Sequence, residues 1–429
     1  MPLIEVKVNK NSSRAVAIAL ALGLVSLLSF AALVNFFAGI VTDPRVNVSK
    51  ELLAATIAYV PNSAPLNARI AEAEMTENDR DISSIENHVK RAVNLSPWDY
   101  RQRLLLATVK DAEGDRAAAE QSLRDALALA PHYTEVHWRL ANLLLREGKL
   151  AKSVDEFRIA ISSNAGLLPG TLDLLGRVSA GNLIVLRAVT PKDPKSQLVL
   201  AQFLLNQPRV PDAITVFAGI DRQVLVGMPE SPEFIDSLVK QGHLEEARGL
   251  WVGLVGGAYA LPGRPLPLLW NGSFESDVSK SLAQFDWAIA RNEYAVPGID
   301  SSSAHSGNRS LRIDFTGRDT TRLDGQVKQN LVLRPGLHYR LQFYVKTERL
   351  DTPEGPRVVV TDPSNTEIVR SDPIPSGTSD WRASAIDFTA PVTARSLVIA
   401  IKRVPRFVYD KPTSGTVWFD DFALTEQAK

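Results

Sequence analysis

The sequence predicts a multidomain chain with three structured parts: an N-terminal transmembrane helix, an all-α helical solenoid and a C-terminal all-β sandwich. Three observations support this fold class. Residues 15–41 carry no charged side chain, a 34-residue pattern recurs through the middle, and short runs of alternating polar and apolar residues fill the last third. Helices and strands need different hydrophobic periods, so the change of pattern near residue 262 indicates a new domain.

The uncharged segment 15–41 is long enough to cross a bilayer, which takes about 20 apolar residues. Lys7, Lys10 and Arg14 precede it, and this positive charge places residues 1–14 in the cytoplasm as a short tail. We therefore expect a single-pass protein of the bacterial inner membrane, with the bulk of the chain periplasmic or otherwise extracytoplasmic. A cleaved signal peptide is the alternative, although its apolar region is usually shorter, at roughly 7–15 residues.

The composition argues against several kinds of site. Lys plus Arg and Asp plus Glu both total 48, so the formal net charge is zero and nothing overall attracts nucleic acid. No cysteine is present, which excludes disulfides, thiolate metal sites and a cysteine nucleophile. The sequence also lacks a Walker A loop, a Rossmann glycine motif, HExxH and G-x-S-x-G. We therefore expect no enzymatic activity; an enzyme of unrecognised type is a third hypothesis beside the two given below.

A repeat of 34 residues organises the middle of the chain. Gly114 and Gly148 lie 34 residues apart, each between two helical patterns with small residues at matching positions. This arrangement resembles the tetratricopeptide repeat, in which two helices flank a turn with Gly. The resemblance covers 51–255 and implies a solenoid, because each helix pair needs a neighbour to bury its apolar face. Residues 165–193 do not follow the pattern, and their pairing stays open.

The resemblance to tetratricopeptide repeats also implies a groove, lined by the first helix of each pair, that binds a protein partner. The residues that we expect on this face are Trp138, Asn142, Arg146, Arg101 and Gln202. Asn142 and Arg146 are one helical turn apart and therefore point the same way. The alternative for each of these residues is ordinary solvated helix surface.

The last part of the chain, 268–426, predicts an antiparallel β-sandwich, and the Pro-rich segment 256–267 predicts a linker before it. Within HYRLQFYVK, alternation places Tyr339, Leu341 and Phe343 in the core. The order and spacing of LLWNGSFES, SAHSGNRSLRIDF, VLRPGLHYRLQFYVKT and TVWFDDFALTE resemble jelly-roll carbohydrate-binding modules of the galactose-binding-like group. The resemblance implies glycan binding, although the same fold serves other binding tasks.

Two adjacent aspartates, Asp420 and Asp421, lie in the final strand pattern TVWFDDFALTE. Strict alternation places Asp421 on one face and Asp420 on the other, together with Trp418, Phe422 and Leu424. An unpaired carboxylate beside three large apolar groups would be costly. Asp420 therefore needs a partner.

The family resemblance implies that this partner is a structural Ca²⁺ ion held by Asp420 and Glu275. The remaining ligands would be oxygen atoms at Ser273, Gly307 and Arg309. Ca²⁺ takes about 6–8 oxygen ligands and accepts both carboxylates and backbone carbonyls. Alternatively, Asp420 accepts hydrogen bonds from backbone amides or pairs with an arginine such as Arg312.

Sugar recognition in such modules relies on aromatic platforms and nearby polar side chains. The candidates are Tyr344, Arg340, Gln342, Trp287 and Trp381. Tyr344 is favoured because its strand phase points outward, whereas Trp287 and Trp381 match positions that are often in the core of the family.

Together these patterns predict a membrane-anchored bacterial envelope protein that binds a protein partner through its repeats and a polysaccharide through its β-sandwich. By analogy, the process would be exopolysaccharide or surface-polysaccharide assembly. The alternative is a non-catalytic scaffold whose β-sandwich contacts protein rather than sugar.

Overall fold

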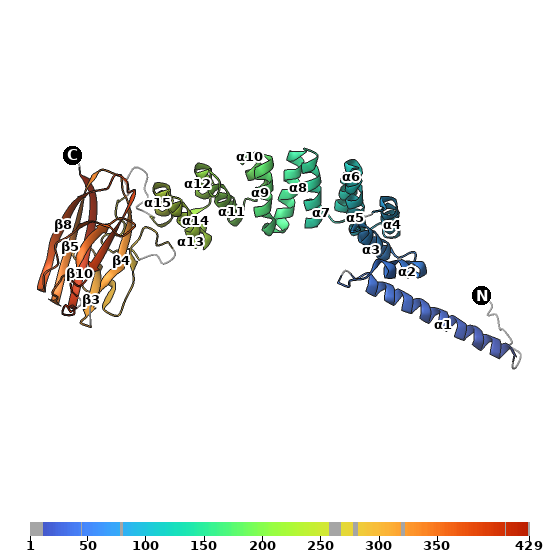
Figure 1. Cartoon of the computed structure of the whole chain (residues 1–429), viewed down its shortest axis with the longest axis horizontal. Helices are drawn as coiled ribbons and strands as arrows, with labels where there is room; N and C mark the ends of the chain where they lie inside the picture. The colour runs from blue at the N-terminus through green and yellow to red at the C-terminus, as the bar shows by residue number, and fades with distance from the viewer. Residues whose placement is uncertain are drawn as a thin grey trace, which may run out of the picture. The chain divides into compact units, whose positions relative to one another are not determined.

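The computed structural model describes residues 12–43, 45–77, 80–256, 267–277, 282–318, 322–407 and 409–427. The chain divides into two compact units, Met1–Pro191 and Lys192–Lys429. Helices form the first unit, and further helices precede two β-sheets in the second (Figure 1). The predicted fold class is confirmed: an apolar N-terminal helix, a helical repeat region and a C-terminal antiparallel sandwich.

The first unit consists of helices joined by short turns. They are α1 (Ser12–Val41), α2 (Lys50–Tyr59), α3 (Ala64–Met75), α4 (Ile82–Leu95), α5 (Tyr100–Ala112), α6 (Arg116–Leu129), α7 (Thr134–Arg146), α8 (Leu150–Ser163), the 3-10 turn η1 (Ala165–Leu167), α9 (Leu168–Val178) and α10 (Leu183–Val189). Ser or Asp side chains accept hydrogen bonds from first-turn amides at the start of α2 to α6, which explains where these helices begin. Residues 165–193, whose pairing the sequence left open, form η1 and the α9–α10 hairpin.

The 34-residue period has a backbone cause. Gly114 and Gly148 have φ values of 84° and 74° at the ends of α5 and α7. This left-handed conformation suits glycine, because it has no Cβ to clash with the carbonyl that follows. The small residues Ala119 and Ala126 of α6 are fully buried against Leu140 of α7, so the helices approach closely. Gly therefore sets the turn of each hairpin, and Ala sets the distance between one hairpin and the next.

The second unit begins with α11 (Pro194–Leu205), α12 (Val210–Ala218), α13 (Arg222–Gly227), α14 (Glu230–Lys240) and α15 (Leu244–Val255). Trp251 of α15 is fully buried and donates its indole N–H to the Leu282 carbonyl at 3.0 Å. Its ring packs edge-on against Trp270 and Phe285, with ring centres 5.3 and 5.8 Å apart. The last repeat helix thus packs directly on the opening segments of the sandwich. Residues 257–266 of the predicted linker lie outside the described residues, and the predicted domain boundaries stay predictions.

Two antiparallel sheets form the sandwich. Their strands are β1 (Ala288–Ile289), β2 (Ala295–Asp300), β3 (Ser310–Thr316), β4 (Leu323–Val332), β5 (His338–Asp351), β6 (Arg357–Thr361), β7 (Glu367–Arg370), β8 (Gly377–Thr389), β9 (Ser396–Arg403) and β10 (Ser414–Gln427). The first sheet has the order β1-β4-β9-β6-β7, and the second has the order β2-β3-β10-β5-β8. Tyr339, Leu341 and Phe343 face the core between the sheets, as alternation predicted.

Alternation fails in β10, and the prediction for Asp420 was wrong in this respect. The pairing of β10 with β5 shifts register between Asp420 and Ala423, and Asp421 has a φ of +49°. This bulge inserts an extra residue, so Phe419 and Phe422 both enter the core, whereas Trp418 and Asp420 lie on the outer face of the second sheet. Asp420 is buried there because residues 301–309 fold over it.

Candidate functional site

A groove of about 420 Å³ lies between α5, α6 and α7 in the first unit. Trp138, Asn142 and Arg146 line it from α7, and Thr108 and Asp111 line it from α5. These three α7 residues are the ones that the repeat pattern predicted on this face. Their spacing of one turn brings them to one side of α7, as expected for positions four apart.

The groove has an apolar floor and walls of mixed charge. Its floor includes Ala107, Ala119, Leu123 and Leu143. The Trp138 ring packs edge-on against the buried Phe157, with ring centres 5.0 Å apart, and this contact fixes its position. Arg146 pairs with Asp111 across the groove, and Arg139 pairs with Glu135 at 2.7 Å. Two carboxylates and two guanidinium groups therefore border a hydrophobic slot, which suits an extended peptide with one apolar side chain.

Arg101 and Gln202 do not line this groove. Arg101 binds the carboxylate of Asp99 at the start of α5, at 2.8 Å. Gln202 lies in α11, in the second unit, and its amide donates to Asn206 at 3.2 Å. Sequence spacing placed both residues on the first helices of repeats. In the structure each side chain instead bonds to a polar neighbour on its own helix or helix start.

Three carboxylates in the sandwich hold residues 301–309, and we call Glu275, Asp420 and Asp421 the carboxylate clamp. Asp420 Oδ2 accepts from the backbone N–H of His305 at 2.7 Å and of Ser306 at 3.3 Å. Asp421 binds the side chains of the same two residues, with 2.6 Å to His305 Nδ1 and 2.7 Å to Ser306 Oγ. The bulge explains why adjacent aspartates can hold one loop, because it turns both carboxylates toward it.

Glu275 completes the clamp from the other end of the loop. Its Oε1 accepts from the backbone N–H groups of Asn308 and Arg309, each at 2.8 Å. Gly307 makes this possible, because a Cβ there would lie 2.4 Å from the same oxygen. The Ser273 hydroxyl also binds Asp421. All five residues predicted around the ion therefore lie together in the structure.

The two aspartates of the clamp have pKa values shifted in opposite directions. Burial raises the pKa of Asp420, and the backbone N–H groups of His305 and Asp421 only partly oppose this. Burial also acts to raise the pKa of Asp421, but hydrogen bonds from the side chains of His305, Ser306 and Ser273 outweigh it, so this pKa lies below its ordinary value. Asp421 is therefore the better-stabilised charge of the pair.

The donors around the clamp decide whether Ca²⁺ fits. Both oxygens of Asp420 and one of Glu275 face backbone N–H groups, with Asp420 Oδ1 accepting from Asp421 N at 2.7 Å. N–H groups cannot ligate a cation, which needs oxygen atoms in their place. No cluster of three or more His, Cys, Asp or Glu suited to a metal occurs among the described residues. In this arrangement the clamp does not fit Ca²⁺. Asp420 instead accepts hydrogen bonds from backbone amides, which is the alternative predicted for it from the sequence. The Ca²⁺ ion itself stays a prediction.

The predicted sugar-binding residues divide between the core and one outer surface. Arg340, Gln342 and Tyr344 alternate with the core residues of β5 and lie on the outer face of the second sheet. Trp381 of β8 lies beside them, half-buried. Trp287 does not: it is fully buried, packs on Phe274 and Phe422 and donates to the Asn271 carbonyl at 3.1 Å. Trp287 is therefore a core residue and has no access to a ligand.

The outer face of β5 and β8, which we call the β5–β8 face, has an aromatic end and a charged end. At the first, the His305 ring stacks on Tyr344 with ring centres 3.5 Å apart, and Trp381 meets His305 edge-on at 5.8 Å. At the other, Arg340 forms an ion pair with Asp387 at 2.9 Å. Tyr344 thus has one ring face covered by His305, and both Tyr344 and Trp381 are half-buried.

Small side chains form the floor between these two ends. Ala385 of β8 and Ala423 of β10 flank Gln342 in register, and both are exposed. Gln342 is exposed as well, with an amide that can both donate and accept hydrogen bonds. At about 3.3 Å per residue, the strip from Arg340 to Tyr344 extends for about 13 Å. A flat, hydroxyl-rich ligand can therefore lie on this strip without meeting a large side chain.

Sequence reasoning missed three contributors to this region. His305 was part of a turn pattern and carried no signal of stacking. Asp387 pairs with Arg340 across strands, and its position became visible only with the β5–β8 register. Trp418 was expected on the core side, but its indole N–H donates to Asp300 at 2.7 Å, with Arg312 and Lys346 over its ring.

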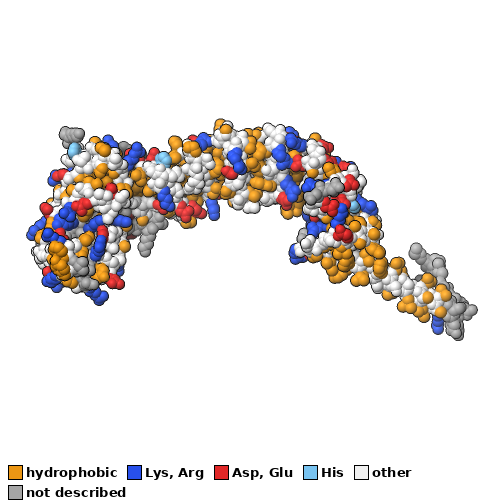
Figure 2. Space-filling view, viewed as in Figure 1, with side chains coloured by type: hydrophobic (Ala, Val, Ile, Leu, Met, Phe, Trp, Pro, Cys, Tyr) orange, Lys and Arg blue, Asp and Glu red, His pale blue; other side chains and the backbone are white. Residues whose placement is uncertain are grey.

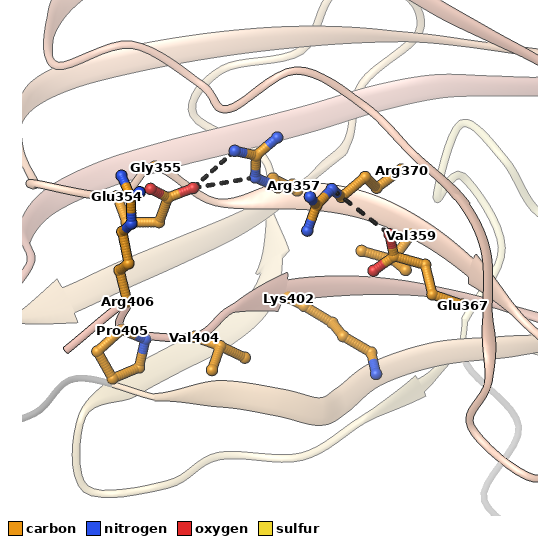
Figure 3. A pocket seen from close by; sticks show the side chains of 10 residues that line it. All are labelled: Glu354, Gly355, Arg357, Val359, Glu367, Arg370, Lys402, Val404, Pro405 and Arg406. Carbon is orange, nitrogen blue, oxygen red and sulfur yellow. Dashed lines mark hydrogen bonds and ion pairs between the residues drawn. The ribbon is translucent and has the colours of Figure 1, made fainter. Parts of the chain in front are cut away.

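A pocket of about 530 Å³ lies on the opposite, first sheet, over β6, β7 and β9 (Figure 3). Four cationic and two acidic side chains line it, and three of the cations form ion pairs, whereas the Arg406 guanidinium lies over the Phe407 ring. Arg357 binds Glu354 at 2.6 Å, Arg370 binds Glu367 at 3.4 Å, and Lys402 binds Asp324 at 3.1 Å. The pocket is therefore largely an ion-pair network, to which Arg406 adds one further cationic group.

Comparison with known proteins identifies the repeats. Residues 112–161 match the family model described as Tetratricopeptide repeat. No curated protein matches the chain. Among solved structures, the chain is similar to MamA at 12% identity, over 45% of this chain and 89% of that one, with a TM-score of 0.27.

Two solved carbohydrate-binding modules are also similar to the chain. The CBM4 structure shares 18% identity over 37% of this chain and 99% of that one, with a TM-score of 0.27. TmCBM61 in complex with beta-1,4-galactotriose shares 19% identity over 38% and 99%, with a TM-score of 0.25. Residues 112–161 thus belong to the tetratricopeptide repeat family, as their spacing predicted, and a two-sheet jelly-roll sandwich follows them in the chain.

Proposed function

We propose that this protein is a membrane-anchored binding protein that holds a polysaccharide on the β5–β8 face of its sandwich and a protein partner in the groove of its first unit. The observation that carries the glycan part is the strip between Trp381 and Arg340. It combines a half-buried aromatic ring, a polar amide and a floor of small side chains. Exopolysaccharide or surface-polysaccharide assembly outside the cytoplasm is the process that this pair of activities would serve.

The chemistry of the strip favours sugar over an apolar ligand. Pyranose rings present C–H groups on one face, which pack on aromatic rings, and hydroxyl groups at the edge, which need hydrogen-bond partners. Trp381 supplies the aromatic contact, and Gln342 and the Arg340–Asp387 pair supply donors and acceptors. Because these groups are partly exposed, binding would be of the weak, multivalent kind that suits a long polymer.

The groove supports the second part of the proposal. A peptide laid along α7 could place an apolar side chain over Leu123 and Leu143, while Asn142 meets its backbone. The Arg146–Asp111 pair would open to receive a charged side chain of either sign. Trp138 would contribute contact area at low entropic cost, because Phe157 already fixes its ring.

Helix α1 supports membrane anchoring. Its segment Arg14–Val41 contains an 18-residue stretch with a mean hydropathy of 2.5 and is long enough to cross a bilayer, although a signal sequence shares these properties. With the positive residues before it, the span would place both binding surfaces outside the cytoplasm. A structural Ca²⁺ ion, which the family resemblance implies, would require oxygen ligands to replace the N–H donors that now surround Asp420 and Glu275.

A polysaccharide array tests the glycan proposal. The full chain in detergent should bind at least one polymer, and Trp381→Ala should weaken that binding by about tenfold, equivalent to 1.4 kcal/mol. Tyr409→Ala is the matched control, because Tyr409 is an exposed aromatic outside the second sheet. Equal losses in both variants, or no binding by the wild-type chain, would contradict the proposal.

The scaffold alternative makes a different prediction. If the sandwich contacts protein, polymers would not bind, and a protein captured by the full chain would be lost on Trp381→Ala.

For the groove, Trp138→Ala combined with Arg146→Ala should abolish partner capture without lowering the melting temperature of the first unit by more than a few degrees. If the double variant still captures the partner, Trp138 and Arg146 are ordinary solvated helix surface with no role in binding.

A further inference from the structure

The C-terminal end of α1 is part of the solenoid core. Ala38 and Val41 are 5% and 2% exposed, although the rest of α1 is largely exposed. Val41 belongs to one hydrophobic cluster with Leu53 of α2 and with Leu66 and Ile70 of α3. The last turn of α1 therefore packs as a structural helix of the first repeat.

The length of α1 agrees with this division. About 20 residues cross the hydrocarbon core, so a span that begins at Arg14 ends near residue 34. The apolar segment continues to Val41, roughly two turns further. The surplus length is explained by the burial of Ala38 and Val41 in protein rather than in lipid.

Helix α2 runs back along α1 toward the membrane. Leu53 near its start packs with Val41, and Tyr59 at its end meets Phe30 of α1, with ring centres 6.4 Å apart. Phe30 lies four residues before the expected end of the span, a depth of about 6 Å at 1.5 Å per residue. With such a span the end of α2 would lie at the depth of the interface, where amphipathic helices are buried to about 5–10 Å.

The outward face of α2 is apolar and uncharged beyond its first turn. Leu52 and Tyr59 are 41% and 69% exposed, and Ala54, Ala55 and Ala58 are exposed between them. No residue of α2 after Glu51 is charged. Figure 2 shows hydrophobic side chains along α1 that continue to its junction with the solenoid. Tyrosine is enriched at membrane interfaces, where its ring meets the acyl chains and its hydroxyl meets water.

We propose that the C-terminal end of α2 enters the outer interface of the same bilayer that α1 spans, so that the helical unit next to the membrane contacts the lipid surface. This inference depends on the proposed anchoring by α1 and adds a second contact to it. The span and the repeat would then form one continuous structure, since Val41 and Leu53 share a core. The occupant of the exposed α2 face is lipid, not a second copy or a soluble partner.

Single-cysteine labelling tests this directly, because the natural chain has no cysteine. Full chains with Ser26→Cys, Ala58→Cys or Ala117→Cys are labelled with a nitrobenzoxadiazole fluorophore and reconstituted in phosphatidylcholine vesicles. All three positions are exposed in the protein, with Ser26 in α1, Ala58 in α2 and Ala117 in α6. Spin-labelled lipids that quench either near the head group or near the chain end then report the depth of each probe.

The expected result differs at the three positions. Ser26→Cys should be quenched best by the deep label, Ala58→Cys by the shallow label with blue-shifted emission, and Ala117→Cys by neither. If Ser26→Cys is quenched but Ala58→Cys behaves like Ala117→Cys, the interfacial placement is wrong and anchoring stands. If Ser26→Cys is not quenched, anchoring itself fails. A blue shift at Ala58→Cys without lipid quenching would mean that protein covers α2, which also contradicts the inference.

Discussion

Trp251→Ala should uncouple the last repeat helices from the sandwich. The Trp251 side chain is fully buried between α15 and the opening segments of the sandwich, where it contacts Trp270 and Phe285. Its removal leaves a cavity lined by both parts and leaves the Leu282 carbonyl without its indole donor. The packing between helix and sandwich therefore depends strongly on this ring.

The size of the effect follows from these contacts. A buried Trp→Ala change typically costs about 3–5 kcal/mol, which includes the cavity left behind. The unsatisfied carbonyl would take the value toward the upper end of that range. For a unit of this length, each kcal/mol corresponds to roughly 2–4 °C, so a loss of about 4 kcal/mol predicts a melting temperature lower by about 8–16 °C.

Scanning calorimetry of the full chain with hydrogen exchange provides the assay. In the wild-type chain α15 and residues 267–277 should exchange at similar rates, because they open together. Trp251→Ala should raise exchange in both, whereas Trp98→Ala, at an 84% exposed tryptophan of the first unit, should change neither. Faster exchange in α15 alone, or a melting temperature within 2 °C of wild type, would refute the proposed coupling.

Three further predictions test the local physics. Gly272→Ala should destabilise the sandwich by more than about 2 kcal/mol in chemical denaturation, because its Cβ would lie 1.9 Å from the Phe422 carbonyl oxygen. Lys149 and Arg124 lower the pKa of Glu120 to about 2, so the wild type should exceed Glu120→Gln in stability at neutral pH and lose that advantage as pH falls from 4.5 toward 2. We expect only about 1 kcal/mol, since both basic partners are over 40% exposed. Finally, chelator should leave the melting of the sandwich unchanged, because N–H and O–H donors satisfy the carboxylate clamp; a fall of several degrees that Ca²⁺ reverses would show that the metal replaces those bonds.

The fold was predictable where one physical cause repeats along the chain. The 34-residue spacing marks the left-handed glycines Gly114 and Gly148, each of which must recur once per hairpin. Likewise, simple alternation sorted β5 into core and outer residues, since that strand is regular from Tyr339 to Phe343. Both patterns arise from residues that lie close together in the chain, so a single sequence is enough to detect them.

The candidate site was predictable only in part, because its geometry depends on irregular backbone. The bulge at Asp421 moved Asp420 to the outer face, and no side-chain pattern marks a bulge in advance. The donors to the clamp are mostly backbone N–H groups, which every residue carries and which therefore leave no trace in the sequence. The coupling through Trp251 was hidden for another reason: a tryptophan in a repeat helix predicts packing within the repeats, not against the sandwich.

The most direct test of the glycan proposal is a hydrogen-exchange footprint of the full chain with its strongest-binding polysaccharide. The proposal predicts protection of residues 338–346 of β5 and 379–387 of β8, with no change in β6, β7 and β9 on the first sheet. Trp381→Ala should remove that protection at the same polymer concentration. Protection confined to the first sheet, or to the helices, would show that the β5–β8 face does not bind the polymer.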